Sequence, residues 1–235
     1  MRNKGFTLLE VLVSLSLFLL ILTLTLKITA INKKIFHCLK EQEETTEFCF
    51  AAIEKMKMDI LKAGELLRDV QEFSLLESIQ VYENKLIIRY GEQTSCLLKN
   101  AIAGVRSIQI INSKSFKKNR KIIIKGKGKE EITEILKRQN STLILKNPLS
   151  FDYKKEDTEI ILIKEIFYFL DPMENILRRK VNRSPAQPLI DGITLFEIEY
   201  SKNKNLLFIK FKKENDRFFQ ILIFPKNLSF SLRRK

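Results

Sequence analysis

An apolar run near the N-terminus constrains this chain more than any other feature. Residues 6–26 carry one formal charge, that of Glu10, and follow a short basic head containing Arg2 and Lys4. A helix of this length spans roughly 30 Å, the thickness of a bilayer's hydrocarbon core. A secretory signal peptide has a shorter apolar region and a small-residue cleavage site. The run therefore predicts a single-pass membrane helix, and the short N-terminal flank favours a cytoplasmic N-terminus with the other 200 or so residues outside.

Glu10 is unusual because it places a charged side chain within the apolar run. An acid inside a membrane helix costs about 2.5 kcal/mol or more and points to function when a partner can be named. A cut between Gly5 and Phe6 would create an α-ammonium group one helical turn from Glu10, and that group could also pair with the Glu10 of a neighbouring copy. A plain membrane anchor, which is the alternative interpretation, has no use for this acid.

Residues 4–11 resemble the prepilin cleavage and methylation motif of type IV pilins and type II secretion pseudopilins. Glycine, phenylalanine and glutamate stand at the family's spacing and head an apolar run. The resemblance implies that a prepilin peptidase cuts after Gly5 and methylates the new N-terminal Phe6. It also implies that Glu10 aligns an incoming subunit by pairing with a neighbour's N-terminus.

The apolar run continues into an amphipathic pattern. From Ile35 to Gly64 the apolar residues recur mostly at spacings of three and four, with acids and lysines between them. No proline precedes Pro148, so we expect one helix from Phe6 to about Gly64. The predicted organisation is a leader at 1–5, a transmembrane half of the helix at 6–32, an amphipathic half at 33–64 and a β-rich globular domain at 65–235.

Beyond residue 78 the pattern changes to short β-like runs. A hairpin is expected at 79–90, a tight turn at 126–129 and a three-stranded meander over 192–224. Further strands are expected at 105–111, 121–125, 142–146, 159–170 and 176–181, a short helix is an option at 129–139, and 184–188 reads as a loop. The predicted fold class is α+β, with a long N-terminal helix packed on an antiparallel β-rich, pilin-like domain.

The last third carries a second, looser resemblance. Residues 167–170, 175–179, 189–200 and 224–228 are similar to sequence blocks of the large minor pseudopilins of the J type and of related minor pilins. The resemblance implies a minor subunit. The middle of the chain, 65–158, matches no pattern of that kind.

The chain lacks the usual signatures of catalysis. It has one histidine, His37, so neither a zinc site built on two histidines nor a serine nucleophile with a free histidine base is expected. The two glycines among lysines at 126–129 favour a turn over a phosphate loop. The acids Asp152, Glu156, Asp157 and Glu159 favour a solvated loop over calcium. We expect no enzyme activity, no metal and no cofactor.

The formal net charge is +14, or about +12 once Arg2 and Lys4 leave with the leader. Basic runs stand at 117–121, 178–180 and 233–235, with Phe116 and Phe230 nearby. On one shared face they would bind nucleic acid, but we favour solvated lysines at strand ends. The basic balance also suits anionic lipid headgroups.

The three cysteines are Cys38, Cys49 and Cys96. The first two are expected on one helix about 16 Å apart, too far for a disulfide. A bridge from either to Cys96 stays open, and three reduced or buried thiols are the favoured interpretation.

The sequence predicts a minor pseudopilin or pilin-like subunit that helps to initiate or cap a type II secretion or type IV pilus fibre. Its expected partners are the prepilin peptidase, other minor and major pilins or pseudopilins, the inner-membrane assembly platform and membrane lipid. Its expected location is the inner membrane, with a periplasmic domain, and then the fibre tip. The alternatives are a pilus-borne module that binds DNA or a surface, and a plain membrane-anchored binding domain.

Overall fold

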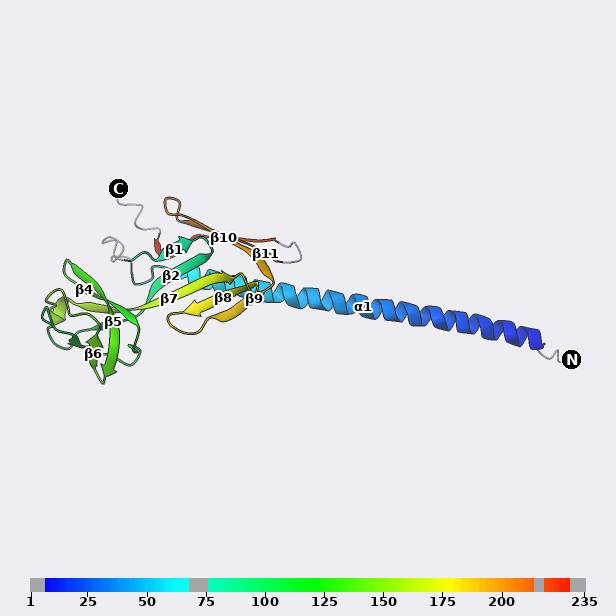
Figure 1. Cartoon of the computed structure of the whole chain (residues 1–235), viewed down its shortest axis with the longest axis horizontal. Coiled ribbons are helices and arrows are strands. Elements are labelled where there is room, and N and C mark those ends of the chain that lie inside the picture. The colour runs from blue at the N-terminus through cyan, green and yellow to red at the C-terminus, as the bar shows by residue number, and fades with distance from the viewer. Residues whose placement is uncertain (1–6, 68–75, 214–217, 229–235) are drawn as a thin grey trace. The chain divides into compact units, whose positions relative to one another are not determined.

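The computed structural model describes residues 7–67, 76–213 and 218–228, apart from the side chains of residues 41, 42 and 45. The chain divides into two compact units, Met1–Ala51 and Ala52–Lys235. A long N-terminal helix is followed by a mostly antiparallel β domain, so the fold class is α+β as expected (Figure 1).

The N-terminal unit is helical. Helix α1 (Leu8–Leu61) begins in it, and its segment Leu8–Lys40 is long and apolar enough to cross a membrane, with a mean hydropathy of 2.4. Hydroxyl groups within the apolar run donate hydrogen bonds to carbonyls of the preceding turn, as Ser14 does to Val11 and Thr25 to Ile21. These polar groups are therefore satisfied inside the helix, as a lipid environment requires.

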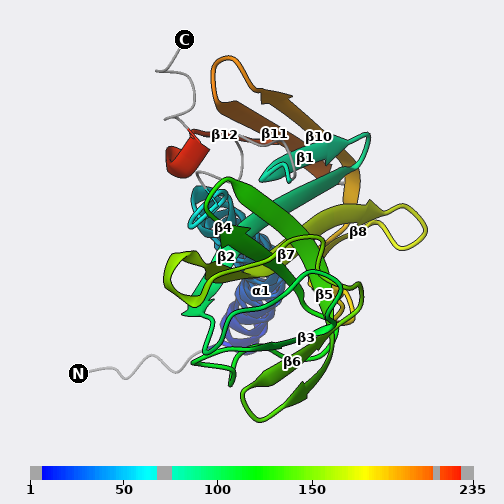
Figure 2. The same ribbon diagram turned by 90° about the vertical axis from the view of Figure 1, so that its left-hand side faces the viewer.

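The C-terminal unit holds two sheets, described here for residues 76–213 and 218–228 (Figure 2). The larger sheet contains β1 (Ile79–Tyr82), β2 (Lys85–Cys96), β3 (Ser107–Gln109), β4 (Lys121–Gly126), β5 (Lys129–Gln139), β6 (Thr142–Leu145), β7 (Glu159–Asp171), β8 (Ile176–Val181) and β9 (Gln187–Asp191). The smaller sheet is the expected meander of β10 (Ile193–Ser201), β11 (Leu206–Lys213) and β12 (Phe218–Ile223). Two short 3₁₀ helices, η2 (Lys155–Asp157) and η3 (Lys226–Leu228), complete the described elements.

Strand β7 is the centre of the larger sheet. One edge pairs with β2 from Glu159 to Phe169. The other edge pairs first with β4 and then, from Ile166 onward, with β8. The sheet therefore forks at 163–165, where neither β4 nor β8 is registered against β7. Side chains and backbone fill the fork: Arg120 donates to the Ile163 carbonyl at 2.8 Å, and the Glu165 amide donates to Asn182 Oδ1 at 2.9 Å.

The end of α1, from Ala52 onward, belongs to the C-terminal unit and packs within it through buried side chains. Met56, Ile60 and Ala63 are fully buried. Asp59 is buried with them and accepts hydrogen bonds from the Tyr168 hydroxyl at 2.6 Å and from Arg179 Nε at 2.8 Å. The predicted apolar stripe thus covers the sheet at the end of the helix, with an ion pair inside the contact.

The turn after α1 passes close to β2. The Gly64 amide donates to the Arg89 carbonyl at 3.0 Å, and the Gly91 amide donates to the Glu65 carbonyl at 2.8 Å. A Cβ at Gly91 would lie 2.7 Å from Leu66 Cβ, so only glycine permits this approach. Helix α1 ends at Leu61 and Gly64 has a φ of 76°, close to the expected termination.

Most expected strands are present, but two predictions were wrong. Residues 129–139 form β5 and not a helix, because the turn at 126–129 returns the chain antiparallel to β4 and pairing overrides the helical spacing of its apolar residues. The loop expected at 184–188 gives way at Gln187 to β9, which pairs with β8. Pro188 fits there because β9 pairs on one side only.

Candidate processing and assembly site

The site begins at the first residue that the structure describes, Thr7. Thr7 precedes the first turn of α1, and its amide and hydroxyl donate to Glu10 Oε2 at 3.0 and 3.1 Å. In return the Glu10 amide donates to Thr7 Oγ1 at 3.4 Å. This reciprocal arrangement is a capping box, which satisfies amides that the helix leaves without carbonyl partners.

The predicted processing residues Gly5 and Phe6 lie outside the described residues. Of the predicted site residues the structure therefore places Glu10, in the first turn of α1. Its partner Thr7 lies within the motif at residues 4–11, but no role for it was predicted. The signal was present, because threonine followed three residues later by glutamate is the capping-box pattern.

Glu10 lies among exposed apolar side chains. Leu9, Val13 and Leu17 surround it on the helix and are more than half exposed. The capping box occupies Oε2 of the carboxylate. An acid on a lipid-facing helix is stabilised by an ionic partner, and the geometry leaves Oε1 for one.

In the basic runs that the structure describes, the arginine side chains form ion pairs with acids of the same chain. Arg178 pairs with Asp171 and Glu174, and Arg179 pairs with Asp59. Arg120 donates to Glu92 at 2.6 Å. These guanidinium groups hold the fold together, which weakens the case for a phosphate-binding face.

The aromatic residues near those runs do not add a stacking platform. Phe116 is fully buried and so cannot stack on a base. Phe230 and the basic run at 233–235 lie outside the described residues.

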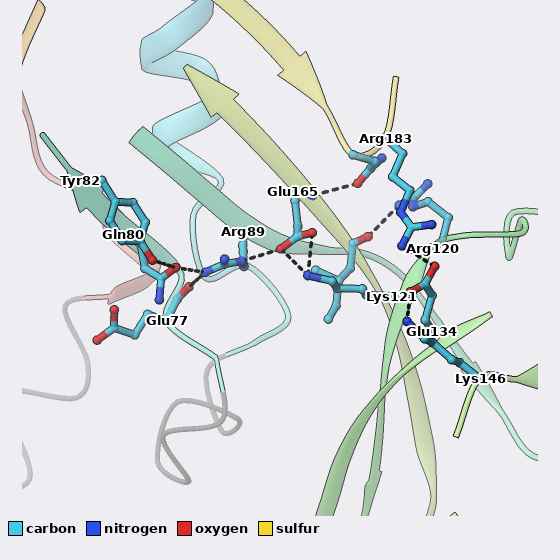
Figure 3. Close-up of polar contacts among 12 residues, drawn as sticks. Glu77, Gln80, Tyr82, Arg89, Arg120, Lys121, Glu134, Lys146, Glu165 and Arg183 are labelled. Carbon is cyan, nitrogen blue, oxygen red and sulfur yellow. Dashed lines mark hydrogen bonds and ion pairs between the residues drawn. The ribbon is translucent and has the colours of Figure 1, made fainter. Parts of the chain in front are cut away.

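A buried ionic network links the fork of the sheet to β1. Glu165 accepts from Arg89 Nε at 2.7 Å and from Lys121 at 3.1 Å, and Arg89 also donates to Gln80 at 2.9 Å (Figure 3). Burial raises the pKa of Glu165, but the hydrogen bonds from Arg89 and Lys121 outweigh it, so the net pKa is lowered. The carboxylate is therefore held ionised between two cations.

The other candidates for metal or redox chemistry are dispersed. Asp152 accepts from the Ala103 amide at 2.7 Å, while Glu156 and Asp157 lie in η2. Within the described ranges no group of three or more histidine, cysteine or acidic residues is arranged to hold a metal ion. No disulfide links the three cysteines, all of which the structure describes.

Comparison with known proteins supports the N-terminal motif. Residues 1–26 match the family model described as the prokaryotic N-terminal methylation motif. No curated protein matches the chain. Among solved structures, the Gp54 tailspike of Acinetobacter baumannii bacteriophage AP22, in complex with a capsular saccharide of that bacterium, is similar at 11% identity and a TM-score of 0.30. That match covers 33% of this chain and 15% of the tailspike, and carries no argument.

The motif and the apolar helix together point to one class of protein. They support a subunit of the type IV pilin and pseudopilin kind, anchored in a membrane by its N-terminal helix. A motif of this kind implies processing by a prepilin peptidase and assembly with other pilins. The class is one of structural subunits.

Proposed function

We propose that this chain is a minor pilin-type subunit that helps to initiate or cap a type II secretion or type IV pilus fibre. The prepilin peptidase cuts between Gly5 and Phe6 and methylates Phe6. Glu10 then docks the subunit by pairing with a neighbour's N-terminus, while the C-terminal unit stays on the periplasmic side of the inner membrane and reaches the fibre tip.

The observation that carries the proposal is the methylation motif at the head of an apolar helix. The motif match covers residues 1–26 and overlaps the span Leu8–Lys40. Glu10 also supports a role in assembly. A helix that only anchors a protein in the membrane has no need of an acid in its first apolar turn.

The J-type assignment is the finer part of the proposal. Three of its four sequence blocks fall on consecutive elements, namely the end of β7, the following turn with β8, then β9 and β10. The fourth block, 224–228, follows β12 and contains η3. This order is compatible with a minor-subunit domain and supports no choice between secretion, motility and DNA uptake.

The first test is the mature N-terminus, measured by mass spectrometry on protein purified from cells that contain a matching prepilin peptidase. We expect the chain to start at Phe6 and to carry one added methyl group. A Gly5→Leu variant is the matched control and should stay uncut, because a bulky side chain replaces the hydrogen of glycine beside the scissile bond. An intact Met1, or a cut beyond the apolar run, overturns the proposal.

The second test separates assembly from anchoring. Glu10→Gln should be processed and should remain in the membrane, yet be lost from sheared fibres when measured by immunoblot. Ser14→Ala is the matched control, because the Ser14 hydroxyl bonds within its own helix to the Val11 carbonyl at 2.9 Å. Equal recovery of the Glu10→Gln variant and the parent in fibres would show that assembly does not need Glu10. Absence of the parent itself from fibres would show a plain anchor.

A further inference from the structure

A cavity of about 510 Å³ lies at the fork of the larger sheet, within the C-terminal unit. Its floor includes Ile163, Phe167 and Phe169 of β7, and its walls come from β2, β4, β8 and the segments beside them. Ligand pockets in proteins have volumes of this order. Because side chains alternate along a strand, Phe167 and Phe169 face away from Tyr168, whose hydroxyl contacts α1. The cavity therefore opens on the face of β7 opposite the end of the helix.

The lining of the cavity is strongly basic. Five of its side chains are cations and one is an acid. The acid, Glu165, is already held by Arg89 and Lys121. The cations are Lys85, Arg120, Lys121, Lys180 and Arg183.

Three of the five cations already have acidic partners within the chain. Lys121 pairs with Glu165, and Arg183 pairs with Glu134 at 2.7 Å (Figure 3). Arg120 pairs with Glu92. Lys85 and Lys180 have no acidic partner among the described residues. They are the charges available to an incoming anion.

The two available lysines flank the aromatic floor from opposite strands. Lys180 of β8 is registered against Phe167, and Lys85 of β2 is registered against Phe169. The Lys85 ammonium lies 5.0 Å from the centre of the Phe167 ring. Cationic groups thus stand on both sides of a half-buried apolar floor.

We propose that this cavity binds an acidic peptide segment of a partner protein, with carboxylates against Lys85 and Lys180 and an apolar side chain against Phe169. The inference stands apart from the proposed function, because every residue that lines the cavity belongs to the C-terminal unit.

Two observations favour a peptide over a nucleic acid. Base stacking needs an open aromatic face, and Lys85 covers one face of Phe167. Phosphate binding needs cations along a track, whereas the neighbouring Arg178 and Arg179 are tied to Asp171, Glu174 and Asp59. A basic pocket with an apolar floor suits a short segment that carries both an acid and an apolar side chain.

The test uses the full-length chain in neutral detergent micelles and the fluorescein-labelled peptide Gly-Asp-Phe-Glu-Gly, blocked at its C-terminus. We expect saturable binding by fluorescence anisotropy that weakens as salt rises, because Debye screening acts on partly exposed charges. The peptide Gly-Asn-Phe-Gln-Gly, with the same shape and no carboxylates, should not bind.

Lys85→Gln/Lys180→Gln removes both available charges without breaking an ion pair of the described chain. It should weaken binding about tenfold, the effect of losing two exposed charge pairs. The control Lys99→Gln/Lys137→Gln makes the same change at exposed lysines outside the cavity and should bind like the parent.

Equal binding of the acidic and amide peptides, no loss in the Lys85→Gln/Lys180→Gln variant, or no binding at all would overturn the inference. Tighter binding of a single-stranded oligothymidylate than of the acidic peptide would also overturn it. Thermal unfolding of both double variants shows that any loss of binding comes from the cavity and not from the fold.

Discussion

Glu165 is the acid on which the centre of the sheet depends. Its side chain is 12% exposed and that of Arg89 is 10% exposed, so loss of the carboxylate leaves a buried cation without its partner. We expect Glu165→Gln to lower the free energy of unfolding by about 3 kcal/mol. Urea denaturation followed by tyrosine fluorescence measures this directly, since the chain has five tyrosines and no tryptophan. Glu156→Gln, at an exposed acid, is the control and should change little.

The same acid gives stability a defined dependence on pH. Because its pKa in the folded chain is lowered, its contribution is fully present above the usual glutamate pKa of about 4.3. The contribution is lost as pH falls through the lower, folded value. The stability difference between parent and Glu165→Gln should therefore shrink in acid and stay constant between pH 6 and 8. A difference that grew in acid would contradict the assignment.

Tyr168 tests the link between helix and sheet. Its hydroxyl donates to Asp59 at 2.6 Å in a buried contact. Burial, followed by the nearby charge of Asp59, raises the pKa of Tyr168, so the hydroxyl keeps its proton. Tyr168→Phe should cost about 1 to 2 kcal/mol of unfolding free energy. Tyr82→Phe is the matched control, because its hydroxyl makes an exposed bond at 3.5 Å. Equal stability of the two variants would show that the buried bond contributes nothing.

Among the elements, the segment that follows α1 approaches β2 so closely that Gly91 has no room for a side chain. A Cβ at Gly91 would meet Leu66 Cβ at 2.7 Å and Ile161 Cγ2 at 2.8 Å. Gly91→Ala should destabilise the chain by about 1 to 3 kcal/mol, measured by urea denaturation. Leu66→Gly should restore part of the loss, because it removes one clashing atom at a position with a φ of 58°. A neutral Gly91→Ala would contradict the close approach.

The elements also show what the sequence could predict. The apolar run, the hairpin at 79–90 and the C-terminal meander followed from local pattern, because hydrophobic period and turn residues act over a few positions. Strand β5 was missed because Ile132, Ile135 and Leu136 have helical spacing, and its pairing with β4 decides the outcome. The fork at β7 could not be predicted, since it joins segments far apart in sequence.

The sequence likewise predicted one part of the candidate functional residues and not the other. Glu10 was identified from its charge within an apolar run, and its capping partner Thr7 follows from a three-residue spacing. The basic cavity could not be predicted, because no local sequence pattern marks it. Its two available lysines, Lys85 and Lys180, are 95 residues apart in sequence, and strand pairing on either side of β7 brings them together.

For the whole molecule, the apolar helix should decide where the chain resides. The full-length protein should stay in the membrane pellet after alkaline extraction, because the residues of the span have no buried place within the chain. A version that begins at residue 33 should appear in the soluble fraction. Glu10→Gln is the control and should remain in the pellet. Release of the full-length chain by alkali would show that the helix does not span a bilayer.

The ion pair at the end of α1 also determines how late in synthesis this contact can form. Asp59 reaches its partners Tyr168 and Arg179 only 109 and 120 residues further along the chain. A chain made from its N-terminus therefore displays the acid and its neighbours Met56 and Ile60 unburied until β8 has emerged. Contacts of such long range close late and slowly. The growing chain consequently passes through a long aggregation-prone interval, in which a chaperone at the membrane surface has its greatest effect.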